Sequence, residues 1–200
     1  MPASANAAFN PSTGFTIEGW INPNSNGNYQ FFVTSNQGAG SWESYWFVGV
    51  TPGGNWRVSY GDALAADTGF AVSFGAWQHF ALVNDGSIST FYVNGVSKGT
   101  KSVSPINTNM NINIGQFGNG ASYWLTGYLS NVRYVKGVAV YTGNFTPPTS
   151  NLTVTQSSGT NISAITGTQT SLLTLQNSTI IDNSTYAFPI TNNGTVTAST

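Results

Sequence analysis

The chain has 200 residues, of which only 6% are Asp, Glu, Lys or Arg, whereas ordinary globular domains carry about 25%. Its formal net charge of -1 offers no basic surface to nucleic acid or anionic lipid, so neither partner is expected. The absence of cysteine excludes disulfides and thiolate metal sites, and no apolar run is long enough to insert in a membrane. Hydrophobic residues make up 40% of the chain, which predicts one folded domain over residues 1–200, and the N-terminus lacks the pattern of a signal peptide.

Short segments rich in aromatic and β-branched residues alternate with Gly, Asn and Pro clusters, which is typical of an antiparallel sandwich. Asp85-Gly86 and Asn94-Gly95 predict tight hairpins because both pairs tolerate positive φ angles. Helical periodicity is nearly absent. We therefore predict an all-β antiparallel sandwich with little or no helix, in which a Ser/Thr/Asn-rich excursion at about 149–170 precedes a returning strand. The predicted strands span about 15–21, 29–34, 45–50, 55–60, 70–74, 77–84, 88–93, 96–100, 111–115, 125–135 and 171–176.

Three segments carry a resemblance to a known family: FTIEGWI at 15–21, WQHFALV at 77–83 running to FYVNG at 91–95, and NIG at 113–115. They resemble the laminin-G-like branch of the concanavalin A-like lectin/glucanase superfamily, which implies a jelly-roll fold. GYLSNVRYVKG at 127–137 and FTPP at 145–148, with LLTLQ at 172–176, resemble a subgroup common in virion proteins of tailed phages, notably cyanophages. The strand that usually precedes FTIEGW looks short, so we expect either a trimmed N-terminus or completion of the sheet by another chain.

The acidic residues do not form the pattern of a glycosidase. The glucanase relatives need paired carboxylates about 5 to 9.5 Å apart, on neighbouring strand positions. His79, the only histidine, lies in the middle of a predicted strand and is expected to be a hydrogen-bonded core residue. We therefore expect a non-enzymatic protein, with a glycoside hydrolase as the weaker alternative. The acids are scattered along the chain: Glu18, Glu43, Asp62, Asp67, Asp85 and Asp182.

Aromatic residues in loops and at strand ends are the candidate ligand-binding residues. Their flat rings can stack on sugar faces while neighbouring Asn and Ser bond the hydroxyl groups. The alternative is that they fill the core, as we expect for Trp20 and Trp77. The candidates are Trp42, Tyr45, Trp46, Trp56, Tyr123 and Trp124.

Metals and cofactors have little support in the sequence. Asp62 and Asp67 lie in one Gly-flanked segment and are weak calcium candidates, because this ion prefers carboxylate and carbonyl oxygens. An ordinary Asx-turn loop explains the same segment equally well. No other cofactor is expected.

Two functions remain open. The first is a virion surface protein, of capsid-decoration or tail-fibre type, that binds host-surface glycans. Display in many copies would strengthen this binding. The second is a purely structural decoration protein without a sugar site, whose partners are other virion proteins or copies of itself. Both predict a homo-oligomer or a place in a larger assembly at the virion surface. The position of the tryptophans separates them, because exposed, clustered rings favour glycan recognition.

Overall fold

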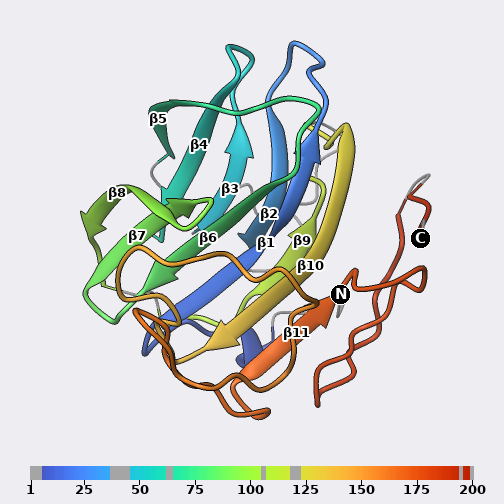
Figure 1. Ribbon diagram of the computed structural model, residues 1–200. Helices are drawn as coiled ribbons and strands as arrows, with labels where there is room; N and C mark the ends of the chain where they lie inside the picture. Colours follow the sequence, from blue (N-terminus) through green and yellow to red (C-terminus); the bar gives the residue numbers. More distant parts are fainter. Residues whose placement is uncertain are drawn as a thin grey trace.

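The computed structural model describes residues 6–36, 46–61, 65–104, 107–117, 123–193 and 196–198, which form two antiparallel sheets packed face to face (Figure 1). The six-stranded sheet has the order β11-β10-β1-β6-β7-β8, and the five-stranded sheet has the order β5-β4-β3-β2-β9. The strands are β1 (Phe15–Pro23), β2 (Gln30–Asn36), β3 (Trp46–Val50), β4 (Asn55–Tyr60), β5 (Ala65–Ala71), β6 (Gln78–Asn84), β7 (Ile88–Val93), β8 (Val96–Ser102), β9 (Asn111–Ile114), β10 (Gly127–Lys136) and β11 (Thr170–Thr174).

The predicted all-β sandwich is confirmed, and each predicted strand overlaps an observed one. The helical structure in the described residues is one 3-10 turn, Ala7–Phe9. β5 begins five residues earlier than predicted, because Ala65–Ala71 pairs with β4 along its length while the apolar Val72 and Phe74 follow the strand. Before β1, where the family pattern predicts a strand, the described residues show two isolated bridges, Asn6 to Met110 and Ser12 to Gly14.

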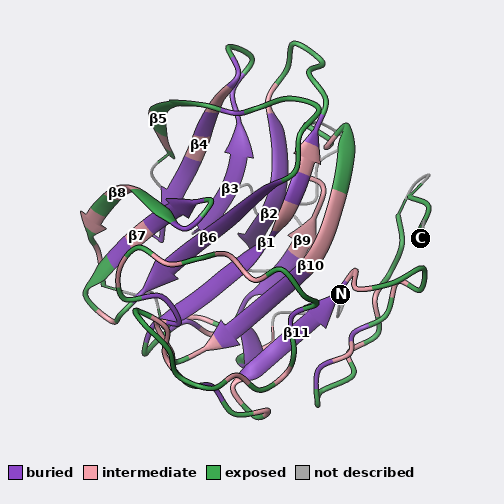
Figure 2. Ribbon diagram, in the orientation of Figure 1, coloured by how far each residue is buried: buried purple, intermediate pink, exposed green. Residues whose placement is uncertain are grey.

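The core lies between the sheets because alternate residues of each strand point inward. Figure 2 shows the buried residues concentrated along the strands. Trp46 stacks against both Phe15 and Tyr134, with ring centroids 5.6 and 5.8 Å away, and those two rings stack on each other at 6.0 Å. Trp56 packs edge-on against Phe32 at 5.6 Å. Large aromatic side chains thus fill the space between the two sheets.

Residues 138–169, here called the third layer, cover part of the outer face of the six-stranded sheet (Figure 1, orange). Val140, Tyr141 and Ile165 from this segment pack on outward-facing residues of β6, β7 and β10. The hydroxyl of Thr16 joins the layers by donating to the carbonyl of Val138 and accepting from the amide of Val140, both at 2.9 Å. The excursion expected near 149–170 is therefore part of a packed layer.

Candidate functional site

Five aromatic residues gather on the outer side of the five-stranded sheet, here called the aromatic face: Tyr29, Phe31, Phe47, Phe117 and Tyr123. Phe31 is central, with its ring centroid 4.5 Å from Phe117, 5.0 Å from Phe47 and 6.1 Å from Tyr123. Tyr29 meets Tyr123 edge-on at 5.9 Å. Such pairs hold one another in place, so the face is a preformed aromatic platform, in which Phe31 and Phe47 are buried, Tyr29 and Phe117 are half-buried and Tyr123 is exposed.

One ion pair borders this platform. The guanidinium of Arg57 lies 4.9 Å from the ring centre of Tyr29 and donates a 2.6 Å hydrogen bond to Asp67. Arg57 and Asp67 are cross-strand neighbours on β4 and β5, so both point to the outer side of the sheet. Asp67 is 54% exposed, which places a fixed carboxylate and guanidinium next to the rings, where they can accept and donate hydrogen bonds.

A buried glutamine fixes the segment that carries the two most exposed rings of the site. The side chain of Gln30 donates to the carbonyl of Asn24 at 2.8 Å and accepts from the amide of Thr126 at 2.7 Å. The amide of Phe31 bonds the carbonyl of Tyr123 at 3.3 Å. Tyr123 and Trp124 are therefore held at the edge of the aromatic face while remaining 42% and 45% exposed.

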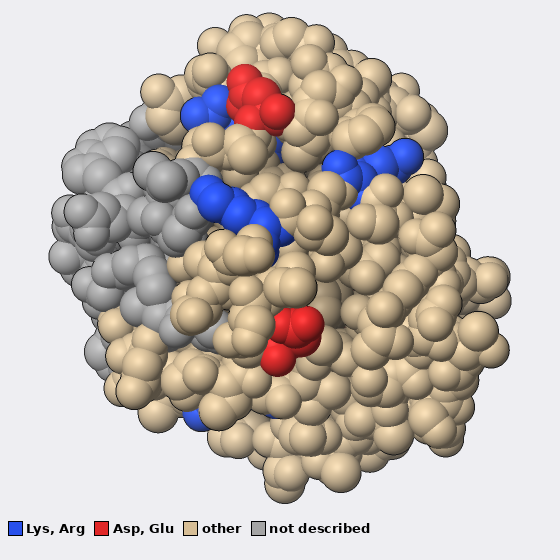
Figure 3. Space-filling model, turned by 90° about the vertical axis from the view of Figure 1, so that its left-hand side faces the viewer, with Lys and Arg blue, Asp and Glu red and all other residues tan. Residues whose placement is uncertain are grey.

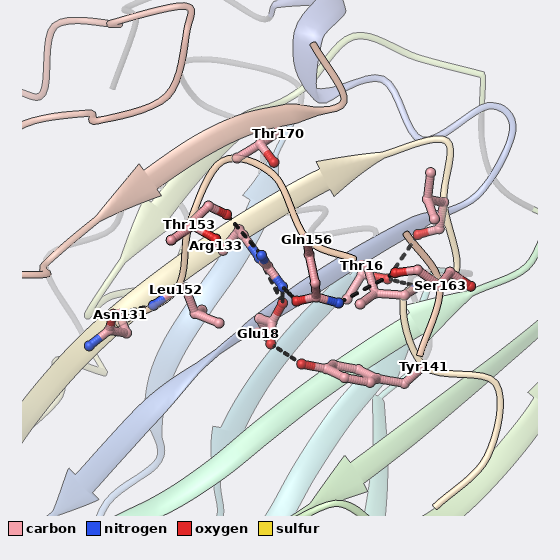
Figure 4. Close-up of polar contacts among 12 residues, drawn as sticks. Thr16, Glu18, Asn131, Arg133, Tyr141, Leu152, Thr153, Gln156, Ser163 and Thr170 are labelled. Atoms are coloured by element: carbon pink, nitrogen blue, oxygen red, sulfur yellow. Dashed lines mark hydrogen bonds and ion pairs between the residues drawn. The ribbon is translucent and has the colours of Figure 1, made fainter. Parts of the chain in front are cut away.

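The second constellation of polar side chains lies under the third layer, and Figure 4 shows how its members converge on Glu18. Arg133 donates to the Oε1 of Glu18 from Nε at 2.9 Å and from a terminal nitrogen at 2.6 Å. The hydroxyl of Tyr141 donates to Oε2 at 2.6 Å, and His79 Nε2 lies 3.3 Å from the same oxygen. Arg133 also donates to the carbonyl of Thr153 and to the side chain of Gln156, both at 2.9 Å.

Glu18 is ionised in this cluster. Burial raises the pKa of its carboxyl, but Arg133 and the hydrogen bonds from His79 and Tyr141 outweigh burial and lower the pKa from 4.5 to about 2. Burial and the neighbouring carboxylate raise the pKa of Tyr141, so its hydroxyl stays a donor. Glu18, His79 and Arg133 are fully buried. The cluster therefore joins the third layer to the sheet and presents no reactive group to solvent.

The predicted site residues divide into three groups. The prediction that Trp46 and Trp56 bind a ligand is wrong, because both are fully buried on inward-facing strand positions. Tyr123 and Trp124 lie at the surface, beside the aromatic face. Trp42, Tyr45 and Asp62 lie outside the described residues.

The structure also bears on the predictions for the other residues singled out in the sequence. His79 is a fully buried, hydrogen-bonded residue, as predicted. Trp20 and Trp77 were expected in the core, but Trp20 is half-buried and Trp77 is 47% exposed, because Trp77 precedes β6 where the third layer does not cover the sheet. Asp67 lies on β5 and bonds Arg57, and the described residues contain no group of three or more potential metal-ligating His, Asp or Glu side chains. Weak calcium binding stays a prediction.

Most of the aromatic face was missed by sequence reasoning. Tyr29 and Phe31 are two residues apart, and Phe47 follows the buried Trp46, so strand alternation indicates that they share the face opposite the core. The missing information was which side of each strand faces inward. The segment Trp46-Phe47-Val48 has bulky apolar residues on both sides of the strand, so the sequence does not show which side faces the core.

The surface around these residues carries little charge. Figure 3, which views the molecule from the side of β5 and β8, shows isolated Lys, Arg, Asp and Glu side chains in a broad uncharged surface. A hollow of about 460 Å³ over the third layer, between Pro148 and Ser157, is lined by Ser, Thr, Asn and Gln with one Leu, and has no aromatic ring for stacking. No helix in the described part of the chain is long and apolar enough to cross a membrane.

Comparison with known proteins agrees with the fold. A laminin-G-type family model, described as the concanavalin A-like lectin/glucanases superfamily, matches residues 2–142. The chain belongs to this superfamily. The fold is thus of the lectin-like type that the sequence motifs predicted, and residues 143–198 add the rest of the third layer, β11 and the C-terminal segment to the matched region.

Two solved structures with TM-scores of 0.50 and 0.54 show the same fold at low identity, and a third is similar at a lower score. A putative carbohydrate binding protein from Bacteroides ovatus is 18% identical with a TM-score of 0.54, covering 68% of this chain and 40% of that one. A sialidase from Trypanosoma rangeli is 18% identical with a TM-score of 0.50, covering 62% and 20%. A heptameric pentraxin from Limulus polyphemus is 18% identical with a TM-score of 0.47, covering 62% and 65%. The chain spans less than two thirds of each of these structures, and no curated protein sequence matches it.

Proposed function

We propose that the protein is a non-enzymatic lectin-like domain that binds glycans through the aromatic face and works at the surface of a virion. The observation that carries the proposal is the pair of exposed rings, Tyr123 and Trp124, fixed by backbone and Gln30 hydrogen bonds at the edge of a preformed aromatic platform. Exposed, clustered rings without a core role indicate a binding surface. Sugar rings stack on such surfaces through their C–H faces, and Arg57 and Asp67 are placed to bond hydroxyl groups.

The four described carboxylates support the non-enzymatic part of the proposal, because each is already engaged by the fold. Glu18 is paired with Arg133, and Asp67 with Arg57. Asp85 accepts the amides of Ser87 and Ile88 in its hairpin. Asp182 accepts four hydrogen bonds from amides and a hydroxyl close to β11. Glycoside hydrolysis needs a carboxylic acid and a carboxylate on either side of the scissile bond.

Glycan binding is tested by probing a printed array of bacterial and algal glycans with the labelled protein and measuring the affinity of the strongest hit by calorimetry. Trp124→Ala and Tyr123→Ala are expected to weaken binding about tenfold each, which corresponds to about 1.4 kcal/mol per ring. Tyr186→Ala is the matched control, since Tyr186 is equally exposed (44%) but stacks on Phe188 in the C-terminal segment. An array without signal, or equal losses in all three variants, would refute the proposal.

The virion part rests on the resemblance of residues 127–137, 145–148 and 172–176 to phage virion proteins. A surface protein of this kind displays many copies, so weak individual sites act together. Two measurements test it: antibody labelling of intact particles by electron microscopy, and the mass of the purified protein in solution. Labelled particles together with glycan binding support the proposal. An ordered oligomer with no array signal would make structural decoration the function.

A further inference from the structure

The third layer does not reach the end of the six-stranded sheet where β1 ends and β10 begins. Toward this end its outermost aromatic contact with the sheet is Phe145 against His79, with ring centroids 5.7 Å apart. Beyond that point the third layer leaves the outer face uncovered, and in Figure 1 the orange segment crosses the sheet without covering the start of β10. Four residues lie there, here called the tryptophan patch: Trp20, Asn22, Trp77 and Tyr128.

Strand register places the patch residues side by side. Asn22 on β1 is directly opposite Tyr128 on β10, so their side chains share one face. Ile21 pairs with Gln78, the first residue of β6, and Trp77 directly precedes it. Trp20 pairs with His79, and the two rings meet edge-on at 5.4 Å. Two neighbouring strands and the residue before a third thus bring three large rings and one amide to the same end of the sheet.

Two of the three rings are exposed, although the fold buries most others of their size, and Trp20 is half-buried. Trp77 is 47% exposed and Tyr128 is 58% exposed, while Trp46 and Trp56 are fully buried. The side-chain oxygen of Asn22 is shielded from solvent and has no hydrogen-bond partner in the described part of the chain. A buried acceptor without a partner costs free energy, which a ligand hydroxyl recovers where the side chains that cover the oxygen move aside to admit it.

The chemistry of the patch selects one class of ligand. On β1, β6 and β10 the charged pair Glu18 and Arg133 lies farther along the strands, enclosed under the third layer. The patch itself offers aromatic rings, one amide and one phenol hydroxyl, and no charge. An anionic or cationic ligand would lose solvation there without gaining a counter-charge. A neutral sugar gains stacking on the rings and a hydroxyl partner for Asn22.

We infer that the tryptophan patch is a second binding site for neutral glycans, on the opposite side of the sandwich from the aromatic face. The class of ligand in this inference rests on the proposed function, whereas the location of the second site rests on the residues of the tryptophan patch. Because the two sites face in opposite directions, one chain would bridge two glycan chains. The domain would then cross-link a polysaccharide layer in addition to adhering to it.

The test follows the indole N–H signals of ¹⁵N-labelled protein by NMR while neutral hexasaccharides (maltohexaose, cellohexaose and chitohexaose) are added one at a time. Trp→Phe variants assign the signals of Trp20, Trp77 and Trp124. The expected result is saturable shifts of the Trp20 and Trp77 signals with at least one hexasaccharide. Tyr128→Ala should weaken this response about tenfold, whereas Trp124→Ala should leave it unchanged.

The outcomes separate the two proposals. Shifts of Trp124 alone would leave the aromatic face as the binding site and overturn the second one. Shifts of Trp20 and Trp77 alone would support the second site and remove the first. The absence of a shift with every hexasaccharide would overturn the neutral-glycan site. The site would also be overturned if the Trp77 signal broadened with increasing protein concentration and this broadening disappeared in Tyr128→Ala. A second copy of the chain would then occupy the patch.

Discussion

The two outer faces of the sandwich are built in opposite ways. Over part of the six-stranded sheet a third layer encloses a carboxylate, a guanidinium and a histidine, all fully buried. On the five-stranded sheet an ion pair of the same two types, Asp67 with Arg57, lies in solvent beside aromatic rings. An enclosed ion pair holds layers together because it cannot exchange its partners for water, whereas an exposed pair is free to meet a ligand. Under the proposed function, stability and recognition depend on different faces.

Removing the buried charge gives the largest expected effect. Glu18→Gln should lower the free energy of unfolding by about 3–5 kcal/mol, because Arg133 would keep its charge in an enclosed site without a counter-charge. Urea denaturation followed by tryptophan fluorescence measures the change. The double variant Glu18→Gln/Arg133→Met should be less destabilised than the sum of the two single variants. A loss below about 1 kcal/mol for Glu18→Gln would show that the cluster does not hold the third layer.

Acid should act through the same carboxylate. The folded pKa of Glu18, about 2, lies below its ordinary value of 4.5, so its contribution is complete above pH 4.5 and is lost as the pH falls toward 2. The loss attributable to this group is on the order of 3 kcal/mol. Denaturation curves between pH 6 and pH 2 measure it. In Glu18→Gln the decline over this window should be shallower, and equal slopes in the two proteins would contradict the assignment.

Tyr141→Phe removes a single hydrogen bond from the cluster. The hydroxyl donates to an ionised acceptor at 2.6 Å, so its loss should cost about 1.5–3 kcal/mol. Tyr134→Phe is the matched control, because that hydroxyl donates at 3.3 Å to the neutral carbonyl of Phe9 and should cost about 1 kcal/mol. Equal losses would mean that the charge of Glu18 adds nothing. Limited proteolysis should cut the third layer faster in Tyr141→Phe than in Tyr134→Phe.

The contrast between the faces also explains what could be predicted from the sequence. The strands were predictable because β-branched runs and the two Gly turns mark them locally, and the family motifs set their order. Trp46 and Trp56 were misjudged because inward or outward orientation depends on the partner sheet. Trp77 was misjudged because its exposure depends on where residues 138–169, distant in sequence, stop covering the sheet.

The buried cluster could not be predicted for a related reason. Glu18 and Arg133 are 115 residues apart, and they meet because β1 and β10 are neighbours in the sheet. Each is a lone charge within an apolar strand motif, which is the signal that was available. A charged residue flanked by buried positions on both sides predicts a partner, although it does not name the partner.

We expect the smallest effect on stability when the exposed ion pair, Asp67 with Arg57, is broken, which makes it the sharpest contrast with the buried pair. Asp67→Asn should change the free energy of unfolding by less than about 1 kcal/mol, because both charges can be solvated by water once the pair is broken. The same variant leaves Arg57 over Tyr29 without its fixed partner, so we expect glycan affinity on the aromatic face to fall severalfold while the urea midpoint stays in place. Arg57→Lys is the control, since it keeps the charge but not the planar group. If Asp67→Asn lowered the free energy of unfolding by several kcal/mol, the ion pair of this face would also stabilise the fold. The proposed difference between the two faces would then be wrong.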